Sequence, residues 1–132
     1  MYSLDEFLTS GDTLQVYDGG TLVFASDKER LLPLMEYIAR SSPHHQQVTI
    51  LDRIVGNAAA LLAVIANCQD LYSPLGSELA IKTLDKHNVR HHFAEIVPYI
   101  QRLDGKHMCP MEKLSFNKEP EEFYETLRNI IK

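Results

Sequence analysis

Residues 47–52, QVTILD, and residues 54–67, IVGNAAALLAVIAN, decide the fold that we predict for this chain. The first run is an almost unbroken series of β-prone residues, as expected for a strand that is covered on both faces. The second run is rich in alanine and apolar on nearly every side, which predicts a helix packed deeply against a sheet. Together they place a β–α unit at the centre of an α/β domain, with Asp52 closing the strand.

The chain before this unit predicts a helix, a hairpin and a second helix. Ser3 and Glu6 have the spacing of a capping box, which predicts a short helix that ends near residues 10–11. The β-prone runs 13–17 and 21–25 flank the turn sequence DGG, which is typical of a tight β-hairpin.

A helical pattern covers residues 27–40. Its apolar residues recur at helical spacing and predict a buried face made of Leu31, Leu34, Met35 and Ile38. Pro33 lies inside this pattern, so it either kinks the helix or marks a later start.

The chain after the central unit predicts further alternating elements. They are a short strand at 70–72, a helix from Ser73-Pro74 to about 86, a strand at 90–96, helical turns at 97–103 and 109–114, and a last helix that opens at Glu119-Pro120. We expect the last helix to bury one side, formed by Phe123, Leu127, Ile130 and Ile131.

This element order predicts one domain over residues 1–132 with a three-layer α/β/α architecture. Its sheet would be a five-stranded mixed sheet that starts with the β-hairpin and is covered by helices on both faces. Ligands in open α/β sheets usually bind beyond the C-terminal ends of the strands, which directs the search for a site to those strand ends.

Composition excludes several classes of function. Thirteen lysines and arginines stand against eighteen acidic residues, a formal net charge of −5, so we expect no nucleic-acid binding. The longest apolar stretch, residues 58–66, is far below the roughly 20 residues that a membrane-spanning helix needs. The N-terminus has neither the basic nor the apolar region of a signal peptide, and we expect a cytoplasmic protein with free thiols.

Three segments, DRIVGNAAA at 52–60, YSPLGSELA at 72–80 and CPME at 109–112, resemble a small bacterial family with a domain of unknown function. The resemblance extends from about residue 8 to residue 131. It implies a cytidine-deaminase-like fold, as in the family's Thermotoga member of known structure. Because the family has no established activity, the resemblance implies a scaffold more than a reaction.

The zinc site of cytidine deaminases is not predicted here. Those enzymes place H-x-E at one helix start and P-C-x-x-C at a later one. Neither the start at residues 55–59 nor that at 73–78 contains a histidine or cysteine. His91 and His92 lie in a predicted strand, where neighbouring side chains point to opposite faces, so one metal ion can hardly bind both. We therefore predict no metal and no cofactor.

Candidate site residues cluster around the central unit. Asp52 closes a buried strand and projects into the expected ligand crevice, or it caps the following helix. Gly56 and Asn57 are predicted ligand residues, because small residues at a helix start let a ligand approach backbone N–H groups. For residues 58–60 we favour close helix–sheet packing.

Further candidates lie at two later helix starts. Ser77 and Glu78 either hydrogen-bond a polar ligand, or their roles are helix capping and that of a solvated first-turn glutamate. Cys109 either acts as a nucleophile activated at a helix start, or makes a ligand contact or a structural turn, with Glu112 three residues later as a further ligand residue. Cys68, at the end of an apolar helix, is expected to be a buried small hydrophobe.

Two functions of different class stay open at this point. The first is binding of a small polar metabolite or nucleotide-like ligand on a metal-free deaminase-like scaffold. If chemistry follows binding, Cys109 would be the nucleophile and a carboxylate the acid or base. The alternative is a non-catalytic regulatory or homo-oligomeric assembly module, with a self-association surface formed by the 54–67 helix and the C-terminal helix. The sequence does not say whether a reaction is catalysed.

Overall fold

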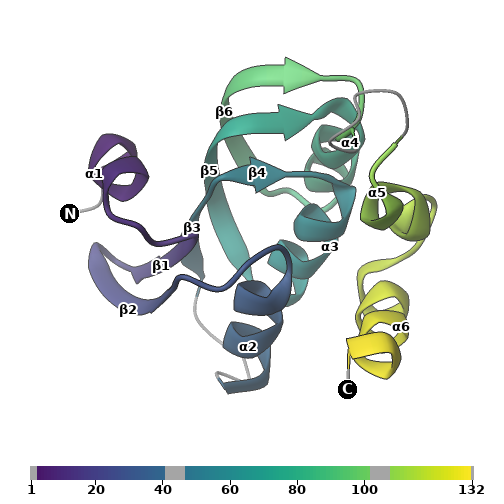
Figure 1. Cartoon of the computed structure of the whole chain (residues 1–132), viewed down its shortest axis with the longest axis horizontal. Coiled ribbons are helices and arrows are strands. Elements are labelled where there is room, and N and C mark those ends of the chain that lie inside the picture. The colour runs from purple at the N-terminus through teal and green to yellow at the C-terminus, as the bar shows by residue number, and fades with distance from the viewer. Residues whose placement is uncertain (1–2, 41–46, 102–107, 132) are drawn as a thin grey trace.

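The computed structural model describes residues 3–40, 47–101 and 108–131, and it is a mixed α/β structure (Figure 1). Its elements, in chain order, are α1 (Leu4–Thr9), β1 (Leu14–Asp18), β2 (Thr21–Ser26), α2 (Leu32–Arg40), β3 (Val48–Asp52), β4 (Ile54–Val55), α3 (Asn57–Ile65), β5 (Cys68–Ser77), α4 (Glu78–Lys86), β6 (Arg90–Val97), α5 (Pro110–Ser115) and α6 (Pro120–Ile131). The predicted alternation of helices and strands is thereby confirmed.

One mixed sheet organises the described residues. The strands β1 and β2 form the predicted antiparallel hairpin, and β1 also pairs antiparallel with β3. The strands β3, β5 and β6 then run parallel to one another. The two-residue strand β4 resumes the line of β3 and pairs with the later part of β5. The five-stranded core of the prediction is therefore β2-β1-β3-β5-β6, with β4 as a sixth, short strand.

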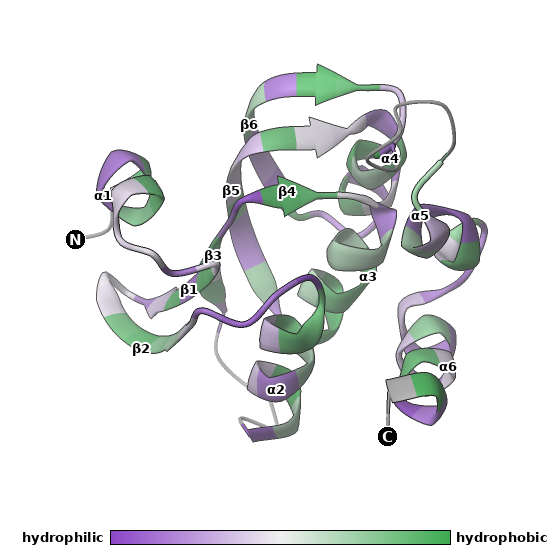
Figure 2. Ribbon diagram, in the orientation of Figure 1, coloured by the Kyte–Doolittle hydropathy of each residue, from purple (hydrophilic) through white to green (hydrophobic). Residues whose placement is uncertain are grey.

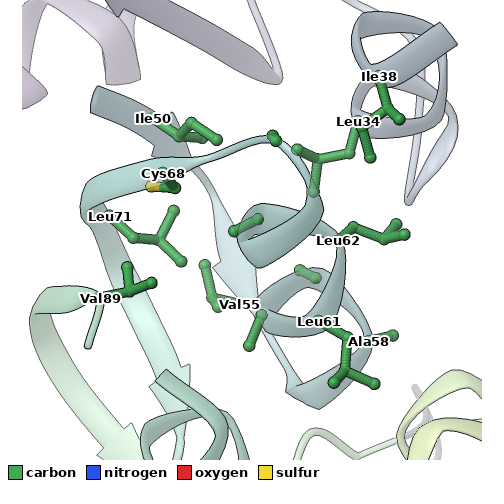
Figure 3. Packing of buried hydrophobic residues seen from close by; sticks show 14 of the residues in the cluster. Leu34, Ile38, Ile50, Val55, Ala58, Leu61, Leu62, Cys68, Leu71 and Val89 are labelled. Atoms are coloured by element: carbon green, nitrogen blue, oxygen red, sulfur yellow. The ribbon is translucent and has the colours of Figure 1, made fainter. Parts of the chain in front are cut away.

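Helix α3 lies at the centre of the packing. It contacts β4 and β5 on one side and the helices α2, α4, α5 and α6 on the others. All residues from Asn57 to Ala63 are buried, as the apolar sequence of this helix predicts. Figure 2 shows the apolar colouring of α3, and Figure 3 shows Ala58, Leu61 and Leu62 among the buried side chains of neighbouring elements.

Helix α1 lies on the other side of the sheet from α3 (Figure 1). Phe7 of this helix and Leu51 of β3 are both buried, but outside the main core cluster that contains Ile50. Neighbouring residues of a strand point to opposite faces, so Ile50 and Leu51 serve the two faces of the sheet. Helices therefore cover both faces, which is consistent with the predicted three layers.

The central helix begins later than its apolar run suggested. Residues 54–55 form strand β4, and α3 begins at Asn57 with Gly56 as its N-cap residue. Helical periodicity cannot separate an apolar strand from an apolar helix start. Here the residues Leu75 and Gly76 of β5 offer the backbone partners that keep residues 54–55 extended.

Strand β5 continues where a helix start was predicted. The prediction placed the helix start at Ser73-Pro74, but β5 runs to Ser77 and the helix α4 begins at Glu78. Pro74 takes part in neither of the two ladders that flank it, because it lies opposite the gap between β3 and β4 and is skipped in the pairing with β6. The missing N–H of proline therefore costs no ladder hydrogen bond.

Two other boundaries differ from the prediction. Helix α2 begins at Leu32, so Pro33 marks the later of the two starts considered, in the first turn where proline is tolerated. Val97 ends strand β6, residues 98–101 are not helical, and residues 102–103 of the predicted segment lie outside the described residues. In α6, Phe123 and Leu127 are buried and Ile130 is 60% exposed, while the side chain of Ile131 lies outside the description.

Packing within one chain uses much of the proposed self-association surface. Helix α3 is buried in the core, and α6 packs inward through Phe123 and Leu127. Ile130, near the end of α6, is 60% exposed. Self-association stays a prediction.

Candidate functional site

A cleft of about 680 Å³ lies beyond the C-terminal end of β3. It is bounded by the chain leading into α2, by β4 and the start of α3, by residues 100–101 and by the start of α5. In the sheet, the hairpin strands β1 and β2 lie on one side of β3, and β5 and β6 lie on its other side. This is the reversal in strand order at which ligands bind in open α/β sheets.

The cleft brings together four of the predicted site residues. Its lining includes Asp52, Gly56, Cys109 and Glu112. These residues lie up to 60 positions apart in the sequence, and the topology of the sheet and of α5 places them around one hollow. The end of β3 and the starts of α3 and α5 thus meet at one cleft, whereas the start of α4, with Ser77 and Glu78, does not join them. The roles of the lining residues as ligand residues stay a prediction.

Asp52 is a titratable group of the cleft whose pKa is strongly raised. Desolvation by burial raises the pKa of its carboxyl group from 3.8 to about 7, although the N–H groups of Arg53 and Ile54 and the charge of Arg53 act in the opposite direction. Its Oδ1 accepts from the Arg53 N–H at 2.8 Å. Asp52 therefore orders the start of β4 and does not cap α3, which corrects the capping alternative.

Glu112 closes one wall of the cleft as a buried structural carboxylate. Its side chain is 1% exposed, Oε1 accepts from the backbone N–H of Asn57, and Oε2 accepts from the N–H of Ile100 at 2.8 Å. A carboxylate at the first N–H of a helix is favoured by the helix dipole. Glu112 thereby ties α5 to the start of α3 and to residue 100.

Gly56 is required because Glu112 approaches so closely. A Cβ atom at position 56 would lie 2.7 Å from Oε1 and 2.9 Å from Cδ of Glu112. Close packing of protein groups thus accounts for this glycine without a ligand. The neighbouring residues Ala58 and Ala59 line the cleft, and their backbone N–H groups lie in the first helical turn, where no intrahelical acceptor exists.

Asn57 is saturated by other protein groups. Its Nδ2 donates to the carbonyl and hydroxyl oxygens of Ser115 at 2.9 and 3.1 Å, and its Oδ1 accepts from the Thr83 hydroxyl. It is 5% exposed and does not line the cleft; it lies on the wall of a second, smaller cavity. Its amide side chain joins α3, α4 and α5.

Cys109 and Cys68 are both free thiols in contrasting places. Cys109 is half-buried, precedes α5 and lines the cleft, and its own N–H donates to the Ile100 carbonyl at 2.7 Å. Cys68 is 5% exposed in the core, and burial raises the pKa of its thiol far above the ordinary value. The expectation of a buried, hydrophobe-like Cys68 is confirmed.

Ser77 and Glu78 lie away from the cleft lining. Ser77 is fully buried and its Oγ accepts from the Ala80 N–H at 3.0 Å, so it is the N-cap of α4. Glu78 is exposed in the first turn of this helix. The capping alternative therefore describes both residues, and the geometry does not bring them to the predicted crevice.

The described histidines do not converge. His92 contacts Asp70 through Nε2 at 3.0 Å and stacks on Tyr72, while His91 lies 3.5 Å from Asp85 of α4. The two rings thus serve opposite faces of β6. Within residues 3–40, 47–101 and 108–131 no group of three or more His, Cys, Asp or Glu residues is arranged to hold a metal ion.

Arg30 and Ile100 are among the cleft residues that were not predicted from the sequence. Arg30 brings a cationic side chain to the cleft and has a φ of +59°, in the left-handed region that non-glycine residues rarely adopt. Ile100 lines the cleft beside Glu112. No signal in the sequence marks a left-handed arginine, because it depends on how the chain enters α2.

Comparison with known proteins gives the family of the chain. The model of the family described as Domain of unknown function (DUF1893) matches residues 3–131. The chain belongs to the DUF1893 family. No curated protein matches this DUF1893 chain.

A solved structure of another DUF1893 protein has a similar fold. The crystal structure of TM1506 from Thermotoga maritima matches with a TM-score of 0.86 and 26% sequence identity, covering 97% of this chain and 86% of TM1506. The predicted family resemblance is thus confirmed, and the cytidine-deaminase-like character of the fold stays a prediction. Among the described residues, no helix is both long and apolar enough to cross a membrane.

Proposed function

We propose that this DUF1893 protein binds a small polar metabolite or nucleoside-like ligand in the cleft beyond β3. The observation that carries the proposal is a carboxyl group with a pKa of about 7 in a cavity of about 680 Å³. That volume lies in the range of small-molecule sites, and strongly perturbed carboxyl groups in clefts are enriched at functional sites.

The lining offers complementary polar groups for such a ligand. Arg30 supplies a fixed positive charge, and the free N–H groups of Ala58 and Ala59 supply donors at the start of α3. Asp52 can either donate or accept near neutral pH, because both of its protonation states are populated there. Ile54, Ile100 and Met111 add apolar contact surface around these groups.

The same cleft contains the groups for a reaction. Cys109 would supply the nucleophile, and Asp52 would act as the acid or base, since a pKa near the working pH suits proton transfer in both directions. Glu112 is excluded from this role by its two backbone hydrogen bonds, which hold it in the wall. Ligand binding is therefore the primary proposal, and catalysis is an extension of it.

Binding is tested with three neutral or zwitterionic probes, cytidine, adenosine and L-asparagine, followed by amide NMR shifts. We expect at least one probe to give saturable shifts at residues 30–31, 54, 56, 58–59, 109 and 111–112, which line the cleft. Asp52→Asn should lower the affinity for that probe by roughly tenfold, which is the contribution of one charge-assisted or donor–acceptor hydrogen bond. Asp27→Asn, at an exposed position outside the cleft, is the matched control.

Alkylation of the two cysteines gives an independent measure. Iodoacetamide should modify Cys109 and spare Cys68, because one thiol lines the cleft and the other is buried in the core. A bound probe should slow the modification of Cys109. If no probe shifts the cleft amides or protects Cys109, or if the Asp52 and Asp27 variants respond alike, the proposed function is wrong.

A further inference from the structure

We propose that a second, smaller cavity between α4 and the α5–α6 connection binds an organic phosphate monoester. This cavity has a volume of about 170 Å³ and contains none of the cleft residues. It takes its walls from one face of α4, from the start of α3 and from residues 116–119. Nothing in the proposed function of the cleft depends on it.

One face of α4 carries basic side chains into this cavity. Leu79, Lys82, Thr83 and Lys86 all line it, and their spacing of three or four residues places them on one side of the helix. Lys118 faces them from the α5–α6 connection. Three lysines therefore surround a hollow on a protein whose formal net charge is −5.

The positive charge of this cavity is only partly neutralised within the described residues. Glu119 is the acidic residue of the lining, and its Oε1 lies 2.7 Å from Nζ of Lys86. The hydrogen bond and charge of Lys86 lower the pKa of Glu119, so this carboxylate is ionised at neutral pH. Lys82 and Lys118 have no acidic partner within 4.0 Å in the part of the chain that the structure describes.

The net charge of the groups that line the cavity favours a ligand with two negative charges. Three ammonium groups and one carboxylate leave two formal positive charges at the cavity, with His87 counted as neutral. A phosphate monoester carries a charge of about −1.5 to −2 at pH 7 and offers three acceptor oxygens. A carboxylate or a neutral ligand would leave at least one ammonium group uncompensated.

The other side of the cavity is apolar, which favours an ester over the inorganic ion. Leu61 is 1% exposed at the floor, and the ring of Phe116 is 52% exposed at the rim. An exposed aromatic ring beside a basic pocket can cover the organic part of a ligand whose phosphate meets the lysines. The side chains of Asn57 and Thr83 are already bonded to each other, so they form wall rather than ligand contacts.

Phenyl phosphate is the probe for this site, titrated into the full chain at physiological salt and followed by amide NMR shifts. We expect saturable shifts at Asn57 and at residues 79–87 and 116–119, with no response at the cleft residues 30–31, 54 and 109. Benzyl alcohol, which has the ring without the charge, and inorganic phosphate, which has the charge without the ring, should each bind at least about tenfold more weakly.

A charge-matched pair of variants tests the lysines. The double variant K82M/K118M should weaken phenyl phosphate by about tenfold or more, since it removes both ammonium groups without an acidic partner. The control K28M/K113M removes the same charge at positions outside the cavity and should leave the affinity within about twofold.

The outcomes separate cleanly. Equal weakening by the two double variants would show general charge attraction and overturn the proposal, as would saturable shifts at the cleft alone. Inorganic phosphate binding as tightly as phenyl phosphate would overturn the ester assignment. The probes for the cleft are two uncharged nucleosides and one zwitterionic amino acid, and none of them is a phosphate ester. A lack of binding at one site can therefore be detected independently of binding at the other.

Discussion

Two groups of polar residues flank the start of α3, and they differ in whether protein groups satisfy them. On one side Asn57, Glu112, Ser115 and Thr83 bond to one another and to backbone groups in a closed cluster. On the other side Asp52 and Cys109 face an open cleft. Local sequence patterns do not distinguish the two groups, since the residues of both lie near the ends of helices or strands.

Polar residues whose donors and acceptors all bond to protein groups form a structural cluster, whereas those left with free bonding capacity form a candidate site. Glu112 is more deeply buried than Asp52, yet both of its oxygens have backbone donors. Asp52 keeps a raised pKa because its hydrogen bonds do not offset desolvation. Buried polar groups that are fully paired specify packing, and those that are not retain chemistry for a ligand.

The largest effect on stability is expected from the closed cluster. Glu112→Ala should lower the free energy of unfolding by about 3–5 kcal/mol, because the N–H groups of Asn57 and Ile100 lose their acceptor inside the protein. Chemical denaturation measures the change. A loss below about 1 kcal/mol would show that the cluster is hydrated and that the contrast with the cleft is wrong.

The second-largest effect on the free energy of unfolding should come from Asp52, and it should depend on pH. Its pKa is raised on folding, so the native state holds a proton that the unfolded state releases from about pH 4 upward. Stability should therefore fall as the pH rises from about 4 to about 7, by up to about 4 kcal/mol, and then level off. The Asp52→Asn variant should lack this decline and be the more stable protein above pH 7.

The measurement for Asp52 is urea denaturation of both proteins across that pH range. The difference between them isolates the contribution of Asp52, because all other carboxyl groups are shared. If the difference does not change with pH, the Asp52 carboxyl group is solvated, and the cleft loses the observation that carries its proposed function.

A smaller effect should follow from crowding the cluster. Gly56→Ala places a Cβ atom 2.7 Å from Glu112 Oε1 and 3.0 Å from Ile100 Cγ1, so we expect a loss of about 1–3 kcal/mol. The same substitution in a Glu112→Ala background should cost much less, because the contacting carboxylate is gone. Additive losses in this double-mutant cycle would refute the close-approach explanation.

The smallest difference concerns two residues that the sequence placed in the site. Ser77→Ala removes the N-cap of α4 and should cost about 1 kcal/mol, whereas Glu78→Ala should change stability by only a few tenths of a kcal/mol. Neither variant should alter probe binding at the cleft. A specific loss of binding in either one would return that residue to the site.

The position of the cleft could be predicted from the sequence because each of its parts is marked locally. A β-prone run ending in Asp52 marks a strand end, and Cys109-Pro110 marks a helix start. Parallel strands bring such ends to one edge of a sheet. The contribution of Arg30 could not be predicted, since no local pattern marks the left-handed backbone that it adopts shortly before α2.

The start of α3, the length of β5 and the structural role of Glu112 could not be predicted, because they depend on partners that are distant in the chain. Proline is rare inside a strand, so Pro74 argues against a strand at this position. Strand β5 continues through it because Pro74 lies opposite the gap between β3 and β4 and needs no ladder hydrogen bond there.

Local patterns are enough to predict the alternation of helices and strands, the burial of α3 and the hairpin, because hydrophobic period and turn chemistry act over a few neighbouring residues. Which polar residues form the walls of a cavity and which face its interior depends on contacts between remote segments. That choice depends on whether a donor or acceptor from a remote segment arrives within hydrogen-bond distance, as it does for Glu112 and Asn57.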